Sequence, residues 1–229
     1  RPRGELAASR LVDGAAGERL IYRRRGEKPP DPGAPQAKPK RLRFVLDISG
    51  SMYRFNSFDR RLDRCCQMAV MVMEALAGFE GKYLWSIVGH SGDASVVPLV
   101  DYAKPPANRA RRLQIVQEMW AHAQYCTSGD STLEAAQDAI AEVAAHEADD
   151  RYVFVLSDAN LRRYRIRPED FGEILTADNR VNAFVFFIAG GGEADRLVSA
   201  LPFGRGVVVE DTARLPAAFK EVFAAASMR

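Results

Sequence analysis

Short segments with apolar runs, which alternate with helical segments, restrict the fold of this chain more than any other sequence feature. The runs are residues 41–49, 82–90, 152–157 and 181–189. Apolar residues recur at helical spacing in 60–77, 107–124, 132–147, 168–176, 193–200 and 214–227. A strand that is apolar at nearly every position is typical of a parallel sheet covered on both faces. The alternation therefore predicts an α/β, doubly wound, mostly parallel sheet with helices on both faces and right-handed crossovers.

One pair of predicted strands departs from the parallel pattern. Residues 82–90 and 95–100 are separated by only four residues, Ser91 to Ala94. So short a connection fits an antiparallel hairpin and is too short for a parallel crossover. Pro98 cannot donate a backbone hydrogen bond, so its strand is predicted at an edge of the sheet. A last short strand is predicted over 206–210.

The charge divides the chain into a basic arm and an acidic body. Residues 1–43 carry a net charge of +7 and the remainder −5. The segment 28–40 holds five prolines, which block helix formation and favour an extended linker. We therefore expect an arm over 1–40, docking on an acidic neighbour, and a folded domain over 41–229. The basic cluster Arg23–Arg25 has only Tyr22 as a stacking platform, which argues against nucleic acid as a partner.

Composition excludes several classes of protein. Of the 229 residues, 47% are hydrophobic and 27% charged, which excludes a wholly disordered chain. No stretch approaches the roughly 18 apolar residues of a membrane span, so none is predicted. Cys65 and Cys66 are adjacent and Cys126 stands alone, a pattern that predicts inert core thiols in a reducing compartment. Because the first residue is Arg1, the chain is expected to be a piece of a longer protein.

Three predicted loops at one edge of the sheet carry oxygen-bearing side chains. Two of these loops follow strands, and the third precedes a helix. Asp47, Ser49 and Ser51 follow the first strand, and Asp158 follows the strand 152–157. The loop 126–132 adds further hydroxyls before a helix. Ligands of such sheets bind at the carboxyl ends of strands, and Mg²⁺ prefers about six oxygen ligands. The plain alternative is that Ser51 and Thr132 are helix N-caps and Asp158 is a turn residue.

The string D-x-S-x-S, with the later threonine and aspartate, resembles the metal-ion-dependent adhesion site (MIDAS) of von Willebrand factor A domains. The resemblance covers about residues 41–229 and implies strand order 3-2-1-4-5-6 with one antiparallel edge strand. It implies direct hydroxyl ligands at Ser49, Ser51 and Thr132, and carboxylates that act through water at Asp47 and Asp158. Ser131 is the alternative to Thr132, which is preferred because Leu-Glu-Ala follows it. The implied ion is Mg²⁺, with Mn²⁺ as the alternative.

A narrower resemblance covers nearly the whole chain. Its strings are SGSMYRFN (49–56), IVGHSGD (87–93), SGDSTLE (128–134) and VLSDANL (155–161). They look like the carboxyl-terminal domain of dynein-like AAA-type ATPases that are targeted to mitochondria, which implies a matrix location. The resemblance implies a non-catalytic module whose ion bridges to an Asp or Glu of a protein partner, with the parent's ATPase ring as a further partner. No G-x-x-x-x-G-K-[ST] loop occurs, so ATP binding is expected outside this chain.

Other functional classes were weighed against this hypothesis. A metal-dependent hydrolase would need a base, yet no histidine lies in the three metal loops. Ser91 in IVGHSGD is similar to the nucleophile of a serine hydrolase, but a strand is predicted after it where that motif needs a helix. His122 and Cys126 have the spacing of half a zinc site, without a second pair. A structural domain with an empty metal site is the remaining alternative.

Overall fold

The computed structural model describes residues 5–6, 22–23, 36–127, 129, 131–158, 166–188, 192–209, 211, 214 and 216–219. Contacts within the chain divide it into two units, Arg1–Ala37 and Lys38–Arg229. The first unit contains an antiparallel pair that the sequence did not predict, β1 (Glu5–Leu6) with β2 (Tyr22–Arg23). Most of the predicted linker, residues 28–35, lies outside the described residues, and the arm and its docking stay predictions. No helix in the described ranges has the length and apolar character needed to cross a membrane.

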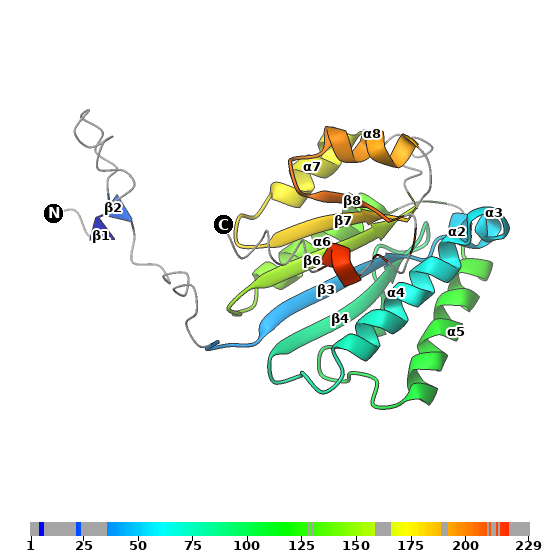
Figure 1. Cartoon of the computed structure of the whole chain (residues 1–229), viewed down its shortest axis with the longest axis horizontal. Helices are drawn as coiled ribbons and strands as arrows, with labels where there is room; N and C mark the ends of the chain where they lie inside the picture. Colours follow the sequence, from blue (N-terminus) through cyan, green and yellow to red (C-terminus); the bar gives the residue numbers. More distant parts are fainter. Residues whose placement is uncertain are drawn as a thin grey trace. The chain divides into compact units, whose positions relative to one another are not determined.

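The second unit is built on a six-stranded sheet, and Figure 1 shows β8, β7, β6, β3 and β4 side by side in that order. Its strands are β3 (Lys40–Asp47), β4 (Tyr83–His90), β5 (Val97–Val100), β6 (Arg151–Ser157), β7 (Asn182–Phe187) and β8 (Gly206–Val208). The order is β5-β4-β3-β6-β7-β8, and only the pair of β4 and β5 is antiparallel. This confirms the predicted order 3-2-1-4-5-6. It also confirms the edge position of β5, which contains Pro98.

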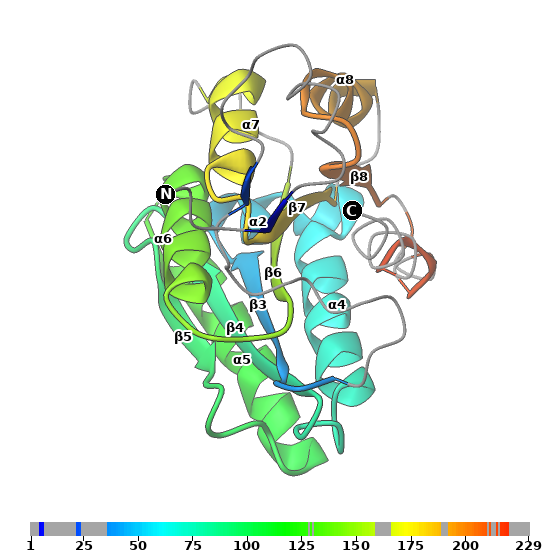
Figure 2. The ribbon, with the colours of Figure 1, turned by 90° about the vertical axis from the view of Figure 1, so that its left-hand side faces the viewer.

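The helices cover both faces of the sheet. They are α2 (Gly50–Arg54), α3 (Asn56–Asp59), α4 (Arg61–Ala75), α5 (Arg109–Tyr125), α6 (Thr132–Ala144), α7 (Pro168–Thr176) and α8 (Gly192–Ala200). Figure 2 shows α4 on one side of the sheet and α6 on the other. The sequence predicted the longer helices but not α2 and α3, because four or five residues are too few to show a helical period. Of the predicted last helix, residues 216–219 are described and helical.

Successive residues of the central strand β3 supply the two halves of the core. Phe44 and Leu46 face the side covered by α4 and α5, whereas Val45 faces the side covered by α6, α7 and α8. Phe44 stacks on Phe154 of the neighbouring strand, with ring centroids 5.1 Å apart. Each fully buried side chain of this size stabilises the fold by about 1.5–3 kcal/mol. Burial on both faces explains why the strands show no polar alternation, and their parallel pairing brings the carboxyl ends of β3 and β6 to one edge.

Candidate metal centre

The loop that follows β3 is held in place by its neighbour β4. The backbone N–H of Ile48 donates to the carbonyl of His90 at 3.0 Å, which continues the ladder one residue beyond Asp47. Gly89 leaves room for the Ile48 side chain, since a Cβ at Gly89 would lie 2.2 Å from the Ile48 Cδ1. Ile48 is fully buried. The residues on either side of it, Asp47 and Ser49, are therefore held at the edge of the sheet.

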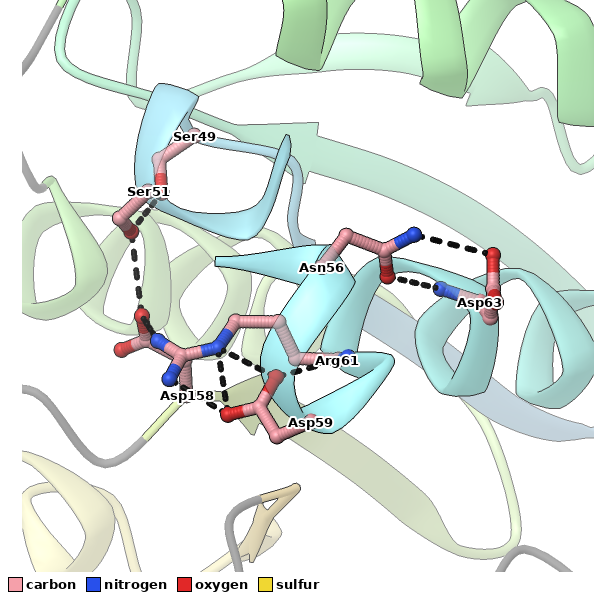
Figure 3. Close-up of polar contacts among 7 residues, drawn as sticks. All are labelled: Ser49, Ser51, Asn56, Asp59, Arg61, Asp63 and Asp158. Atoms are coloured by element: carbon pink, nitrogen blue, oxygen red, sulfur yellow. Dashed lines mark hydrogen bonds and ion pairs between the residues drawn. The ribbon is translucent and has the colours of Figure 1, made fainter. Parts of the chain in front are cut away.

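A chain of hydrogen bonds links four of the five predicted site residues. Asp47 Oδ1 accepts from the backbone N–H of Ser49 at 2.9 Å. The hydroxyl oxygens of Ser49 and Ser51 are 2.9 Å apart, and Ser51 Oγ donates to Asp158 Oδ2 at 3.0 Å. Figure 3 shows the two serines and Asp158 pointing toward one another from separate loops. All four side chains are buried, so the loops after β3 and β6 meet through polar groups withdrawn from bulk water.

The loop that precedes Thr132 packs on the turn that follows β3. A Cβ built on Gly50 would contact the carbonyl oxygens of Cys126 and Thr127 at 3.5 Å, so these backbones lie against each other. Cys126 Sγ also donates to the carbonyl of Ile48 at 3.7 Å. Cys126 and Thr127, at the start of the loop that precedes Thr132, therefore contact the loop after β3.

The helix starts argue against simple capping roles. Thr132 is the first residue of α6 and is fully buried, and the N-cap residue is Ser131. The N-cap of α2 is Ser49, and Ser51 lies inside the helix. Neither Ser49 nor Ser131 caps its helix with a side-chain hydrogen bond. The alternative that Ser51 and Thr132 serve as helix N-caps is therefore wrong for both residues, and the choice between Ser131 and Thr132 stays a prediction.

Arg61 is a site residue that the sequence reasoning missed. Its Nη1 donates to Asp158 Oδ2 at 2.6 Å, and its Nη2 donates to Asp59 Oδ2 at 2.6 Å (Figure 3). The guanidinium also lies 5.1 Å from the centre of the Phe55 ring. A basic residue at a helix start is electrostatically unfavourable, and this was the available sequence signal. Asp158 is thus an ion-pair partner of Arg61 and not merely a turn residue.

The pair of Arg61 and Asp59 changes the ionisation of both groups. Burial alone would raise the pKa of Asp59, but hydrogen bonds and charge from Arg61 outweigh it and lower the pKa. Burial likewise acts to lower the pKa of Arg61, and the two carboxylates Asp59 and Asp158 raise it overall. Both groups are therefore charged at neutral pH, and the guanidinium joins two carboxylates that lie far apart in the sequence.

The nucleophile hypothesis for Ser91 meets a steric obstacle. Ser91 Oγ lies 3.0 Å from Nε2 of His122 and accepts the backbone N–H of Asp93 at 3.2 Å. However, Ser91 has no exposed surface. The strand β5 follows it, where a hydrolase elbow would need a helix. The contact holds the β4–β5 turn against the end of α5.

Cys65 and Cys66 are buried core thiols, whereas Cys126 is only partly buried. Burial raises the pKa of Cys65 well above its usual value and that of Cys66 to about 12, and burial likewise raises the pKa of Cys126. All three are free cysteines. Within the described ranges, no group of three or more His, Cys, Asp or Glu side chains could hold a metal ion. A zinc site built on His122 and Cys126 therefore has no support.

The residues at the edge of β3 and β6 nevertheless fit a hard ion that takes hydroxyl ligands. In an octahedral Mg²⁺ shell with oxygens about 2.05 Å from the ion, adjacent ligands lie about 2.9 Å apart. The hydroxyls of Ser49 and Ser51 have this separation, 2.9 Å. Two buried carboxylates lie beside them: Asp158 accepts from the Ser51 hydroxyl, and Asp47 accepts from the backbone N–H of Ser49. The donor set is thus suited to Mg²⁺ or Mn²⁺, and it includes hydroxyls as well as carboxylates.

Known proteins share both the sequence and the fold. No family model matches the chain. Over 96% of its length the chain is 48% identical to von Willebrand factor A domain-containing protein 8 of Mus musculus, and it spans 12% of that protein. The PilB minor pilin of Streptococcus sanguinis is similar in structure, with a TM-score of 0.56 at 13% identity, over 86% of this chain and 63% of that one. Proximal thread matrix protein 1 of the mussel byssus is also similar in structure, with a TM-score of 0.53 at 16% identity. The similarity covers 81% of this chain and 45% of that one.

The structural similarities support the fold alone, since these sequences are very different from this one. The sequence similarity is of another kind, because nearly half of the residues are identical along almost the whole chain. It agrees with the strand order and with the D-x-S-x-S loop at the edge of the sheet. The chain is therefore a von Willebrand factor A domain, homologous to one segment of von Willebrand factor A domain-containing protein 8.

Proposed function

We propose that this domain is a metal-ion-dependent protein-binding module, with Mg²⁺ as the resident ion and Mn²⁺ as the alternative. One observation carries the proposal. Two buried serine hydroxyls lie 2.9 Å apart, within a hydrogen-bond chain that ends in a buried carboxylate on each side. Ser49, Ser51 and Thr132 would hold the ion directly, and Asp47 and Asp158 would act through water.

The hydrogen bonds prepare the hydroxyls for this role. When Ser51 donates its proton to Asp158, the lone pairs of its Oγ are available to a cation. The backbone N–H of Ser49 neutralises part of the Asp47 charge and fixes that carboxylate beside the loop. Once bound, a divalent ion with neutral hydroxyl ligands supplies an electrophilic centre that an outside carboxylate can complete. The chain's own contribution is to hold the donors in place and to keep water from competing.

The surroundings of the site suit a protein partner. Phe58, next to Asp59 in α3, is 84% exposed, and Tyr125, next to Cys126, is 80% exposed. Aromatic side chains of this kind are common energetic anchors of protein interfaces. We therefore propose a partner that presents an Asp or Glu flanked by apolar residues.

The identity of the parent protein extends the proposal. The chain spans only 12% of its mouse relative, which leaves most of that protein for other functions. From the resemblance to dynein-like AAA-type ATPases, we propose that ATP is bound elsewhere in a longer parent and that the parent's ATPase ring is a second partner of this domain. The same resemblance supports a mitochondrial, matrix location.

Metal binding is tested by calorimetric titration of the chain with MgCl₂. We expect saturable binding that falls at least about tenfold in Ser49→Ala, because that variant loses a direct hydroxyl ligand while keeping the backbone N–H that bonds to Asp47. Ser95→Ala is the matched control, since Ser95 is bonded to Asp138 away from the site. Equal Mg²⁺ affinity in all three proteins, or no binding, would reject the metal site.

Partner binding is tested by capture from a mitochondrial extract with Mg²⁺ and then with a chelator. A partner that is retained only with Mg²⁺, and lost in Ser49→Ala, supports the proposal. Retention that is indifferent to the chelator would favour a structural domain that binds through another surface. Ester or peptide hydrolysis that requires Mg²⁺ and is lost in Ser49→Ala would instead support the hydrolase alternative.

A further inference from the structure

We infer that Arg61 is the internal counter-ion of this site and sets its affinity for the divalent ion by competing for Asp158. The inference rests on the proposed metal-binding function and concerns a residue outside the D-x-S-x-S string. In the structure, the same oxygen, Oδ2 of Asp158, accepts from Ser51 at 3.0 Å and from Arg61 at 2.6 Å. The Arg61 guanidinium therefore shares an acceptor oxygen with the Ser51 hydroxyl, which is expected to bind the metal ion.

Arg61 is held rigidly in this position. Asp59 receives hydrogen bonds from Nε at 3.0 and 2.9 Å and from Nη2 at 2.6 Å. The Phe55 ring lies beneath the guanidinium, 5.1 Å away, and the Arg61 side chain is only 14% exposed. A side chain fixed by two carboxylates and a ring is not a loose surface arginine, and the geometry of this cation is therefore part of the site.

Local helix energetics do not explain an arginine at this position. Arg61 is the first residue of α4, and positive charge at a helix N-terminus opposes the helix dipole. Its contact with Asp158 explains it better. Asp158 is 3% exposed, and a buried carboxylate is costly unless it has a charged or hydrogen-bonding partner. Arg61 supplies that partner when no ion is bound.

In this arrangement the Arg61 guanidinium and a bound divalent ion would compete for Asp158. A divalent ion held by Ser49 and Ser51 would lie close to the Arg61 guanidinium, and like charges repel strongly in a site removed from water. Ion binding then requires the guanidinium to loosen its contact with Asp158. Arg61 thereby stabilises the metal-free domain and raises the ion concentration at which the site fills.

The test compares Arg61→Gln with Arg60→Gln in the whole chain. Arg60 is adjacent, 70% exposed and paired with Asp63, so its variant removes one positive charge without touching Asp158. We expect Arg61→Gln to bind Mg²⁺ about tenfold more tightly by calorimetry, since a nearby repelling charge is gone. We also expect it to melt at a lower temperature in chelator and to recover on addition of Mg²⁺. Arg60→Gln should match the unchanged protein in both measurements.

The Mg²⁺ affinities of these variants distinguish failure of the Arg61 inference from failure of the proposed metal site. Unchanged Mg²⁺ affinity in Arg61→Gln, with affinity lost in Ser49→Ala, would overturn this inference and leave the proposed metal site intact. Weaker Mg²⁺ binding in Arg61→Gln would also overturn it. Mg²⁺ binding by Arg61→Gln alone would support the inference while rejecting metal dependence of the natural domain. Binding by no protein would overturn both.

A second measurement covers the case in which Arg61→Gln does not fold. The side-chain Nε resonance of Arg61 in the unchanged protein should shift on titration with MgCl₂, as the contact with Asp158 is loosened. Resonances that stay in place while Mg²⁺ binds would contradict competition. The Arg60 Nε resonance serves as the internal control.

Discussion

The two ends of strand β3 both carry buried charge, but they neutralise it in different ways. At the amino end, Arg41 and Arg43 share Glu142 of α6 as their carboxylate partner. Tyr102 donates to Glu142 at 2.9 Å, and its ring lies 3.8 Å from the Arg41 guanidinium. At the carboxyl end, Asp47 is instead bonded to a backbone N–H and is linked to Asp158 through two serine hydroxyls.

The difference separates a structural network from a candidate binding site. At the amino end Arg41 and Arg43 are already paired with the opposite charge of Glu142, so that end gains little from a ligand. Hydroxyls are weaker partners and keep lone pairs that a cation can use. Strand β3 thus joins a network of ion pairs at its amino end to a network of hydroxyl and carboxylate groups at its carboxyl end.

The largest expected effect comes from breaking the amino end. Glu142→Gln leaves Arg41 and Arg43 nearly buried without their carboxylate, which should lower the free energy of unfolding by about 3 kcal/mol. Urea unfolding measures this, with exposed Glu134→Gln on the same helix as the control. Mg²⁺ affinity should stay unchanged, because Glu142 contacts none of the site residues through the bonds described above. A parallel loss of Mg²⁺ affinity would show that the two ends are coupled.

The second largest expected effect is a loss of folding stability at low pH, caused by the buried His90 at the carboxyl end of β4. His90 is the partner of Asp47 in the β3–β4 ladder, and burial lowers its pKa to about 3. The unfolded chain, with a histidine pKa near 6.5, binds more protons than the folded one between these values, so stability falls as the pH drops below about 6.5. At pH 5 the loss should be about 2 kcal/mol.

The measurement is urea unfolding at pH 7.5 and pH 5. His90→Gln should show a smaller difference between the two pH values than the unchanged chain. An unchanged pH dependence in His90→Gln would mean that other groups cause the acid sensitivity.

The smallest expected effect concerns the hydroxyl that completes the carboxyl end. Thr132→Val keeps the volume of a fully buried side chain and removes only its hydroxyl, which should weaken Mg²⁺ binding on the order of fivefold. Ser131→Ala, at the partly exposed neighbour, should leave the affinity unchanged. Calorimetric titration with MgCl₂ distinguishes them. Loss of affinity only in the serine variant would reverse the assignment.

The sequence was informative where one physical signal dominated. Uninterrupted apolar runs identified β3, β6 and β7, and Pro98 marked the edge strand. The oxygen-bearing residues were found because the carboxyl ends of parallel strands must share an edge, which brings Ser51 and Asp158 together from 107 residues apart.

Other parts of the site could not be read in this way. Arg61 follows Arg60, whose φ of +56° lies in the left-handed region between α3 and α4. A left-handed arginine has no sequence signature, since that conformation is typical of glycine and asparagine. The short helices α2 and α3 were missed for the related reason that they depend on tertiary contacts and not on periodicity.

The missing side chain of Gly89 has a consequence for how this domain can vary. Ile48 occupies the space where a Cβ would be, so even alanine at position 89 must push against a fully buried side chain between Asp47 and Ser49. Such a variant would keep every proposed ligand and still displace the loop that presents them. In related chains, loss of metal binding could therefore arise in a strand that holds no ligand, and an intact D-x-S-x-S string would conceal it.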